Sequence, residues 1–151
     1  MRVGIACDHR GYEAKKRLLP VLKKGEHEVR DFGCDSPTSC DYPDFAIPAA
    51  RAVAANEVDI AILLDGSGIG MSVAANKVRG VRAALVHDEF TAQRAREHNH
   101  CNVLCLGTDL LSEEQIRKIV DIFMHTAFAD GRHRQRVEKI RELLEQPPNC
   151  P

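Results

Sequence analysis

The segment VDIAILLDGSGIGMSVAANKV, residues 58–78, contains a strand, a glycine-rich loop and a helix in direct succession. Residues 58–64 form a nearly unbroken apolar run, which is typical of a strand that is covered on both faces in a parallel sheet. The loop 66–70 holds three glycines and a serine, and the segment 71–78 is expected to be a helix. Glycines let the backbone approach a ligand, and free N–H groups at a helix start favour an anion.

The same alternation of short apolar runs and longer amphipathic runs continues along the chain. Five strands alternating with helices predict a three-layer α/β/α sandwich around a five-stranded parallel sheet. Pro20 lies inside the first expected helix, where a proline can kink or break it. We expect one domain over residues 1–146 and a disordered tail at 147–151. The expected strands are 2–7, 27–33, 58–64, 81–87 and 101–107, and the expected helices are 12–24, 45–55, 71–78, 89–99, 112–128 and 134–146.

Composition narrows the class of protein. The 151 residues are 44% hydrophobic and 28% charged with a net charge of −1, which is ordinary for a globular domain and favours neither nucleic acid nor an acidic membrane. No apolar run reaches the roughly 20 residues of a membrane span. The N-terminus lacks the pattern of a signal peptide, so we expect a cytoplasmic protein with reduced cysteines. The six cysteines include no CxxC pair, and we expect neither a metal nor a cofactor.

Polar residues follow every strand of the predicted sheet, in the segments CDHRG (7–11), FGCDSPTSCDYPD (32–44), DGSGIG (65–70), VHDE (86–89) and GTDL (107–110). In open parallel sheets ligands bind at the carboxyl ends of the strands, near a switch in strand order. The loop 66–70 follows the third strand rather than the first and lacks both the dinucleotide and the Walker spacing. The loop is thus either a tight strand–helix turn whose glycines serve geometry alone or an anion site, and Asp65 and Ser67 favour the second. We expect the chemistry of the protein at this edge of the sheet.

Asp65 stands between the third strand and the glycine loop, and two interpretations of it remain open. An aspartate in front of a helix is often an N-cap, whose carboxylate accepts hydrogen bonds from the first N–H groups. A carboxylate beside several N–H donors can also act as a base, when the donors stabilise an oxyanion on the substrate and the acid removes a proton from the adjacent carbon. In the second interpretation Asp65 and the loop contact opposite parts of an enediolate.

Histidines and arginines outside this loop are further candidates. The pair Asp8–His9 after the first strand can bind hydroxyls or an anion, although it also suits a surface turn. His98, at the end of a helix, is either a second site histidine or a partner of the helix dipole. Arg132 and Arg136 are four residues apart and share a helix face, so together they could hold a phosphate; alternatively, they belong to a solvated basic face.

Several motifs occur in order between residues 2 and 140: CDHRG, DYPD, GSGIGMSVAANKV, RAALVHD, TAQRAREHN, NVLCLG and GRHRQRVEKI. With these motifs the chain resembles the B-type ribose-5-phosphate isomerases, a family that includes galactose-6-phosphate and allose-6-phosphate isomerases. The resemblance implies a Rossmann-like sheet and a homodimer, sometimes paired into a tetramer. It also implies metal-free interconversion of an aldose phosphate and a ketose phosphate through ring opening and a cis-enediolate.

The resemblance further implies that the site lies at the dimer interface and that the partner chain supplies some of its groups. The C-terminal helix of each chain would reach the partner. Asp8 and His9 would bind sugar hydroxyls and phosphate, and His98 would help to open the ring. The remaining implied contacts are Tyr42, the anion-hole loop with Gly66, Ser67, Gly68, Ile69 and Gly70, Asn99 beside His98, and the phosphate-binding Arg132 and Arg136.

The chain departs from the family pattern at the base and at a phosphate contact. Many members have a cysteine base at the position of Asp65, and one branch has a glutamate base at the position of Met71, so Asp65 is the only acid left in this loop. Asp109 stands where members often carry an arginine. The leading hypothesis is isomerisation of ribose 5-phosphate with Asp65 as the base. The alternatives are isomerisation of another sugar, with or without phosphate, and a non-catalytic subunit that binds a sugar phosphate.

Overall fold

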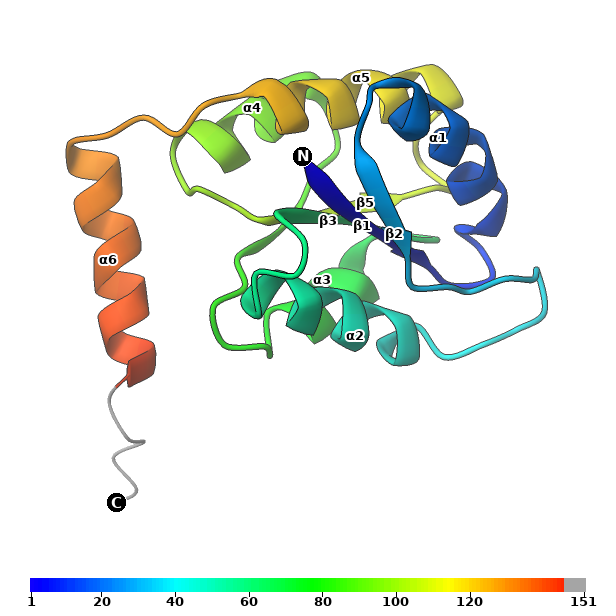
Figure 1. The fold of residues 1–151 in the computed structure, drawn as a ribbon, viewed down its shortest axis with the longest axis horizontal. Coiled ribbons are helices and arrows are strands. Elements are labelled where there is room, and N and C mark those ends of the chain that lie inside the picture. Colours follow the sequence, from blue (N-terminus) through cyan, green and yellow to red (C-terminus); the bar gives the residue numbers. More distant parts are fainter. Residues whose placement is uncertain (146–151) are drawn as a thin grey trace.

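The computed structural model describes residues 1–145 and contains one five-stranded parallel sheet. The spatial order of the strands is β2-β1-β3-β5-β4, and every neighbouring pair is parallel. The predicted α/β class and the parallel sheet are therefore confirmed (Figure 1). The strands are β1 (Arg2–Cys7), β2 (Glu28–Asp31), β3 (Ile60–Asp65), β4 (Ala83–Leu85) and β5 (Val103–Gly107).

Helices cover both faces of the sheet, with α1, α4 and α5 on one face and α2 and α3 on the other (Figure 1). The pleat of β3 serves both layers, because Ile62 and Leu64 pack toward the first face while Ala61 and Leu63 pack toward the second. This arrangement explains why the strand is apolar throughout. The helices are α1 (Tyr12–Lys24), α2 (Pro43–Ala54), α3 (Ile69–Ala75), α4 (Glu89–Glu97), α5 (Glu113–His125) and α6 (Arg132–Glu145).

The chain changes direction across the sheet between β1 and β3. From β1 it moves outward to β2, then crosses back so that β3 pairs with the other side of β1. The loops after β1 and β3 consequently leave the same sheet edge side by side and diverge to opposite faces. This is the switch point at which open parallel sheets bind ligands, and it brings together the turn after Cys7 and the loop after Asp65.

The first helix, expected over 12–24, has those bounds in the structure, and one strand needs correction. The first helix runs unbroken through Pro20; the buried Leu18 and Leu22 on either side pack against the sheet and hold it in place. The edge strand β4 is shorter than the predicted 81–87, because Asn side chains take over part of its hydrogen bonding. The Arg82 N–H donates to Asn102 Oδ1, and the Ala83 N–H donates to Asn76 Oδ1. These two N–H groups therefore bond to side chains instead of to a neighbouring strand.

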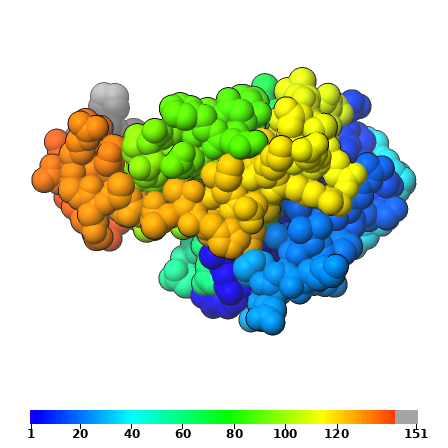
Figure 2. Space-filling view, turned by 90° about the horizontal axis from the view of Figure 1, so that it is seen from above, coloured from blue at the N-terminus to red at the C-terminus, as the bar shows by residue number. Residues whose placement is uncertain are grey.

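Helix α6 projects from one end of the body, past α4 and away from the carboxyl ends of the strands (Figures 1 and 2). The helix predicted over 134–146 is present as α6, and it begins two residues earlier than predicted. The expected tail 147–151 lies outside the described residues. Within residues 1–145, each helix is too short or too polar to cross a membrane.

Candidate active site

An open pocket of about 330 Å³ lies at the carboxyl edge of the sheet, over the switch point. Its lining comes from the ends of three neighbouring strands and from the start of α2. A volume near the lower end of the range for ligand sites suits a small molecule. The lining residues are Asp8, Arg10, Tyr42, Asp65, Gly66, Ser67, Gly70 and Asp109.

Asp65 is the last residue of β3, and its side chain is almost completely buried. One carboxylate oxygen, Oδ1, accepts a hydrogen bond from the Gly68 N–H, and Oδ2 accepts a longer one of 3.3 Å from the Met71 N–H. Burial raises the pKa of Asp65 above its ordinary value, and the nearby charge of Asp8 adds to the rise, while these N–H groups act in the opposite direction. A carboxylate with a raised pKa is suited to proton transfer.

These contacts differ from the arrangement expected from the sequence, in which Asp65 and the loop contact opposite parts of a substrate. The Gly68 N–H is directed at Asp65, and the Ile69 N–H donates to the Ser67 hydroxyl oxygen at 3.2 Å. A buried carboxylate attracts the nearest unpaired donors, and those are the N–H groups at the start of α3. Two of the expected anion-hole donors therefore face protein oxygen atoms in this structure.

Gly68 makes this loop possible. It has a φ of +79°, in the left-handed region, and a Cβ at this position would lie 2.3 Å from Leu85 Cδ1 and 3.1 Å from the Gly107 backbone nitrogen. Only glycine combines this conformation with so close an approach to the end of β5. The tight turn places the Ser67 side chain in the pocket, beside Asp65.

Asp8 and His9 form the turn after β1. Asp8 is buried, and its Oδ1 accepts the N–H groups of Arg10 at 2.8 Å and Gly11 at 3.0 Å, which fixes the turn that leads into α1. His9 Nδ1 accepts the Cys40 N–H at 3.3 Å, so a neutral His9 carries its proton on Nε2. Asp8 lines the pocket, whereas His9 lies beside it.

Tyr42 reaches the pocket from the start of α2. Its ring lies over Gly70, where an added Cβ would be 2.9 Å from the ring carbon Cζ. Tyr42 is 37% exposed and lines the pocket together with Asp65. The structure thus brings together the sequence-predicted residues Asp8, Tyr42, Asp65, Gly66, Ser67 and Gly70.

The predicted residues of α4 and α6 do not line this pocket. Helix α4 runs back from the carboxyl edge, so His98 at its end lies toward the opposite edge of the sheet, near α6 (Figure 1). The His98 ring stacks on His133 with centroids 4.1 Å apart, and Arg94 Nη1 lies 3.2 Å from His98 Nε2. His98, Asn99, Arg132 and Arg136 thus lie outside the lining of the pocket of the same chain.

Sequence reasoning did not single out Arg10, although it lies within the quoted motif CDHRG. Arg10 lines the pocket and forms an ion pair with Asp109, 99 residues further along the chain. No local pattern reveals a pair so far apart. In the part of the chain that the structure describes, no group of three or more histidine, cysteine or acidic side chains is arranged to hold a metal.

A polar pocket at the switch point of a parallel sheet is typical of α/β proteins that act on a small ligand. A family model described as Ribose/Galactose Isomerase matches residues 3–140 of this chain. The chain therefore belongs to the ribose/galactose isomerase family, as its motifs indicated.

Individual relatives are similar over nearly the whole chain. Ribose-5-phosphate isomerase B of Escherichia coli (strain K12) is 40% identical over 142 residues, which cover 94% of this chain and 95% of the relative. The structure of ribose-5-phosphate isomerase B of Clostridium thermocellum gives a TM-score of 0.94 at 43% identity, over 96% of this chain and 98% of that one. The Mycoplasma genitalium enzyme with bound ribulose-5-phosphate gives 0.93 at 41% identity, over 97% of both chains.

We expect Gly68→Ala to disrupt the site loop, and Gly80→Ala provides a matched control. Both glycines have positive φ, but a Cβ at Gly80 has only the Ala54 side chain near it, at 3.9 Å. Gly80→Ala should cost about 1–2 kcal/mol of unfolding free energy from backbone strain alone. Gly68→Ala should cost about 1–3 kcal/mol more, because a methyl group is forced against backbone. Urea unfolding at fixed protein concentration measures both, and equal losses would contradict the close approach.

Proposed function

We propose that the protein is an aldose–ketose isomerase that interconverts ribose 5-phosphate and ribulose 5-phosphate. The observation that carries this proposal is the pocket at the switch point, where Asp65, Ser67 and Asp8 converge in a chain of the ribose/galactose isomerase family. The names of the relatives given above support the choice of sugar. The simplest test is to incubate the protein with ribose 5-phosphate and to follow ketose formation by absorbance.

Asp65 is the proposed base. The open-chain sugar presents C2 to the carboxylate, which takes the C2 proton and returns it to C1, while the hydroxyl proton moves from O2 to O1. The less tightly held oxygen, Oδ2, is the atom we assign to this transfer. The raised pKa of Asp65, caused mainly by burial, makes the carboxylate a stronger base than an exposed aspartate.

Ser67 and Asp8 are assigned to the substrate oxygens. Ser67 Oγ accepts the Ile69 N–H, which leaves the hydroxyl proton to donate to the negative oxygen of the enediolate. Asp8 uses Oδ1 to hold its own turn, so Oδ2 is the oxygen that would accept a sugar hydroxyl. Each of the two side chains thus has one atom that fixes the local backbone and one for the ligand.

The cysteines near the site are poorly suited to replace Asp65. Burial raises the pKa of the Cys7 thiol well above its ordinary value, and Cys7 is fully buried. The pKa of Cys40 is raised to about 11, first by burial and then by its hydrogen bond with Cys34. Thiols with such pKa values are protonated at neutral pH and weak as bases, and none of the described cysteines lines the pocket.

We propose further that the complete site forms in a homodimer. A sugar phosphate needs a ring-opening group and cations, and His98, Arg132 and Arg136 lie away from Asp65 in the same chain. Helix α6 projects from the body with an exposed Ile140, as expected of a segment that reaches a partner (Figure 1). In this arrangement His98 and the two arginines of one protomer complete the pocket of the other.

The contacts of Asp65 also support one alternative, a non-catalytic subunit that binds a sugar phosphate. A carboxylate held by two N–H groups satisfies the N-cap role on its own. The raised pKa does not separate the two roles, because burial raises the pKa of this carboxyl whether it acts as a cap or as a base. Binding of ribose 5-phosphate without any ketose formation would establish the alternative.

Asp65→Asn should lower kcat by about 10²–10⁴-fold, the usual contribution of a general base. Asparagine keeps the size of the side chain and one acceptor for the Gly68 N–H, so substrate affinity should change little. Steady-state kinetics and calorimetric binding of ribose 5-phosphate measure the two effects. A loss of less than tenfold in kcat would exclude Asp65 as the base.

The pH dependence tests the identity of the base directly. In the wild type, kcat/KM should fall as the pH drops through the raised pKa of Asp65, so the acid limb should lie above the ordinary aspartate value of about 3.9. Asp65→Cys should retain part of the activity and move the acid limb upward by several pH units, because a thiol has an ordinary pKa of about 8.5. An acid limb that stays in place would show that another group is titrating.

Subunit exchange tests the shared site. Homodimers of Asp65→Asn, and of Arg132→Ala with Arg136→Ala, should each be nearly inactive. In a mixed dimer one site collects both defects and the other collects neither. Random pairing should therefore restore activity to about a quarter of the wild-type value, since half of the dimers are mixed and each has one intact site. No recovery, with mixed dimers confirmed by native mass spectrometry, would show that the arginines serve their own chain.

A further inference from the structure

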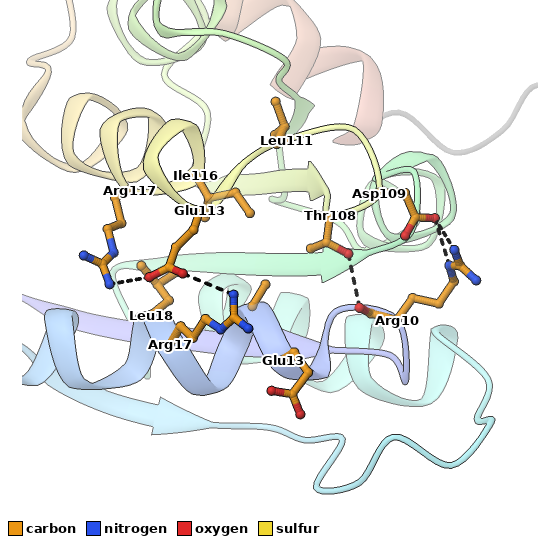
Figure 3. Close-up of a pocket in the computed structure, with 11 residues that line it drawn as sticks. Arg10, Glu13, Arg17, Leu18, Thr108, Asp109, Leu111, Glu113, Ile116 and Arg117 are labelled. Atoms are coloured by element: carbon orange, nitrogen blue, oxygen red, sulfur yellow. Dashed lines mark hydrogen bonds and ion pairs between the residues drawn. The ribbon is translucent and has the colours of Figure 1, made fainter.

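Arg10 extends from the turn after β1 across the end of β3 to Asp109, which follows β5. Its Nε and Nη2 lie 2.9 and 2.6 Å from Asp109 Oδ2 (Figure 3). The backbone of the Arg10 turn is also fixed, because the Thr108 hydroxyl donates to the Arg10 carbonyl at 3.2 Å. Two strand ends therefore determine where this guanidinium lies.

The ion pair lies directly over the site loop. A Cβ added to Gly66 would be 2.8 Å from Arg10 Nε and 2.8 Å from Asp109 Oδ2. Gly66 stands between Asp65 and Ser67 in sequence, so the guanidinium lies above the residue that links the proposed base to the proposed oxyanion donor. Arg10 and Asp109 both line the same pocket as these two residues.

The charged side chains that line the pocket are mostly acidic. The lining contains three carboxylates, those of Asp8, Asp65 and Asp109, and among the described residues Arg10 is its only cation. A dianionic phosphate entering this pocket without Arg10 would meet three carboxylates and no cation among the described residues of the lining. The ion pair of Arg10 with Asp109 adds a positive group to this lining, to which an anion can bind.

Stability does not explain the pair. The side chains of Arg10 and Asp109 are 56% and 44% exposed, and exposed ion pairs contribute roughly 0–1 kcal/mol. Both contacts go to a single oxygen of Asp109, and within the described chain the Nη1 group of Arg10 has no protein partner. The guanidinium therefore has donors directed to solvent and a fixed position beside the site.

We propose that Arg10 binds the phosphate of the sugar phosphate in its own protomer, and that Asp109 is a positioning residue that holds the guanidinium over the loop. This proposal rests on the proposed function. With C1 and C2 of the sugar against Asp65, the phosphate at the other end of the carbon chain lies at the pocket mouth, where Arg10 is exposed. A guanidinium binds phosphate oxygens through paired hydrogen bonds, which a lysine cannot reproduce.

The proposal also gives Asp109 a role at the position where the family resemblance implies an arginine. The cation is Arg10, which follows β1, instead of an arginine after β5, and Asp109 holds it in place. A rival explanation is that Arg10 merely neutralises Asp109. The two explanations differ in what they predict when Arg10 and Asp109 are both replaced by alanine. If Arg10 only neutralises Asp109, phosphate binding should return; if Arg10 binds the phosphate, binding should stay weak.

The test uses calorimetric binding of D-ribitol 5-phosphate, which cannot isomerise, with D-ribitol as the ligand that lacks phosphate. Arg10→Ala should weaken binding of ribitol 5-phosphate about tenfold to a hundredfold, the range of a hydrogen bond to a charged group, and leave binding of ribitol unchanged. Arg10→Ala with Asp109→Ala should stay weak, whereas Arg10→Ala with Asp109→Arg should recover most of the affinity by returning a cation from the opposite wall.

Arg17→Ala is the matched control, because Arg17 is an exposed arginine of α1 that pairs with Glu113 away from the loop (Figure 3). It should bind both ligands like the wild type. Wild-type affinity in the double alanine variant, or unchanged affinity in Arg10→Ala, would overturn the proposal. An equal loss for ribitol and ribitol 5-phosphate would overturn it as well, because Arg10 would then contact the sugar. A wild-type protein that binds neither ligand and forms no ketose would overturn the proposed function along with it.

Discussion

The hydrogen bonds between the Asp65 carboxylate and the N–H groups at the start of α3 are the interaction on which the site depends. A carboxylate at the end of a buried strand must find donors, and the nearest are those of Gly68 and Met71. Reaching them requires the left-handed turn at Gly68, and that turn fits only because the residue has no side chain. One buried charge thereby determines the path of the loop, the start of the helix and the position of Ser67.

The parts of the structure that follow from local patterns could be predicted from the sequence. The apolar run 58–64 and its glycine loop indicated a buried parallel strand, and the gathering of Asp8 and Asp65 at one edge follows from parallel pairing. The direction of the Asp65 side chain could not be predicted, because a cap and a base need the same residues in the same order. Long-range pairs such as Arg10–Asp109 were equally hidden, since their partners lie 99 residues apart.

The distribution of charge bears on the proposal that the complete site forms in a homodimer. The pocket holds the acids Asp8 and Asp65 and the Arg10–Asp109 pair, while the histidine and the two arginines proposed to bind the substrate belong to α4 and α6 and do not line it. Helices that follow parallel strands return to the amino edge, so residues at their ends cannot reach the pocket of the same sheet. If His98, Arg132 and Arg136 bind the substrate, as we propose, they do so at the strand ends of a second copy.

A carboxylate in this loop has different electrostatic requirements from a thiol. An ionised aspartate adds a negative charge next to the developing enediolate and engages N–H groups that would otherwise face the substrate. Burial raises its pKa, and in the proposed mechanism its charge is lost when it takes the proton from carbon, so that the enediolate forms beside a neutral acid. The remaining negative charge is that of the phosphate, for which the proposed contact is Arg10, held by Asp109 over Gly66 of the same glycine loop.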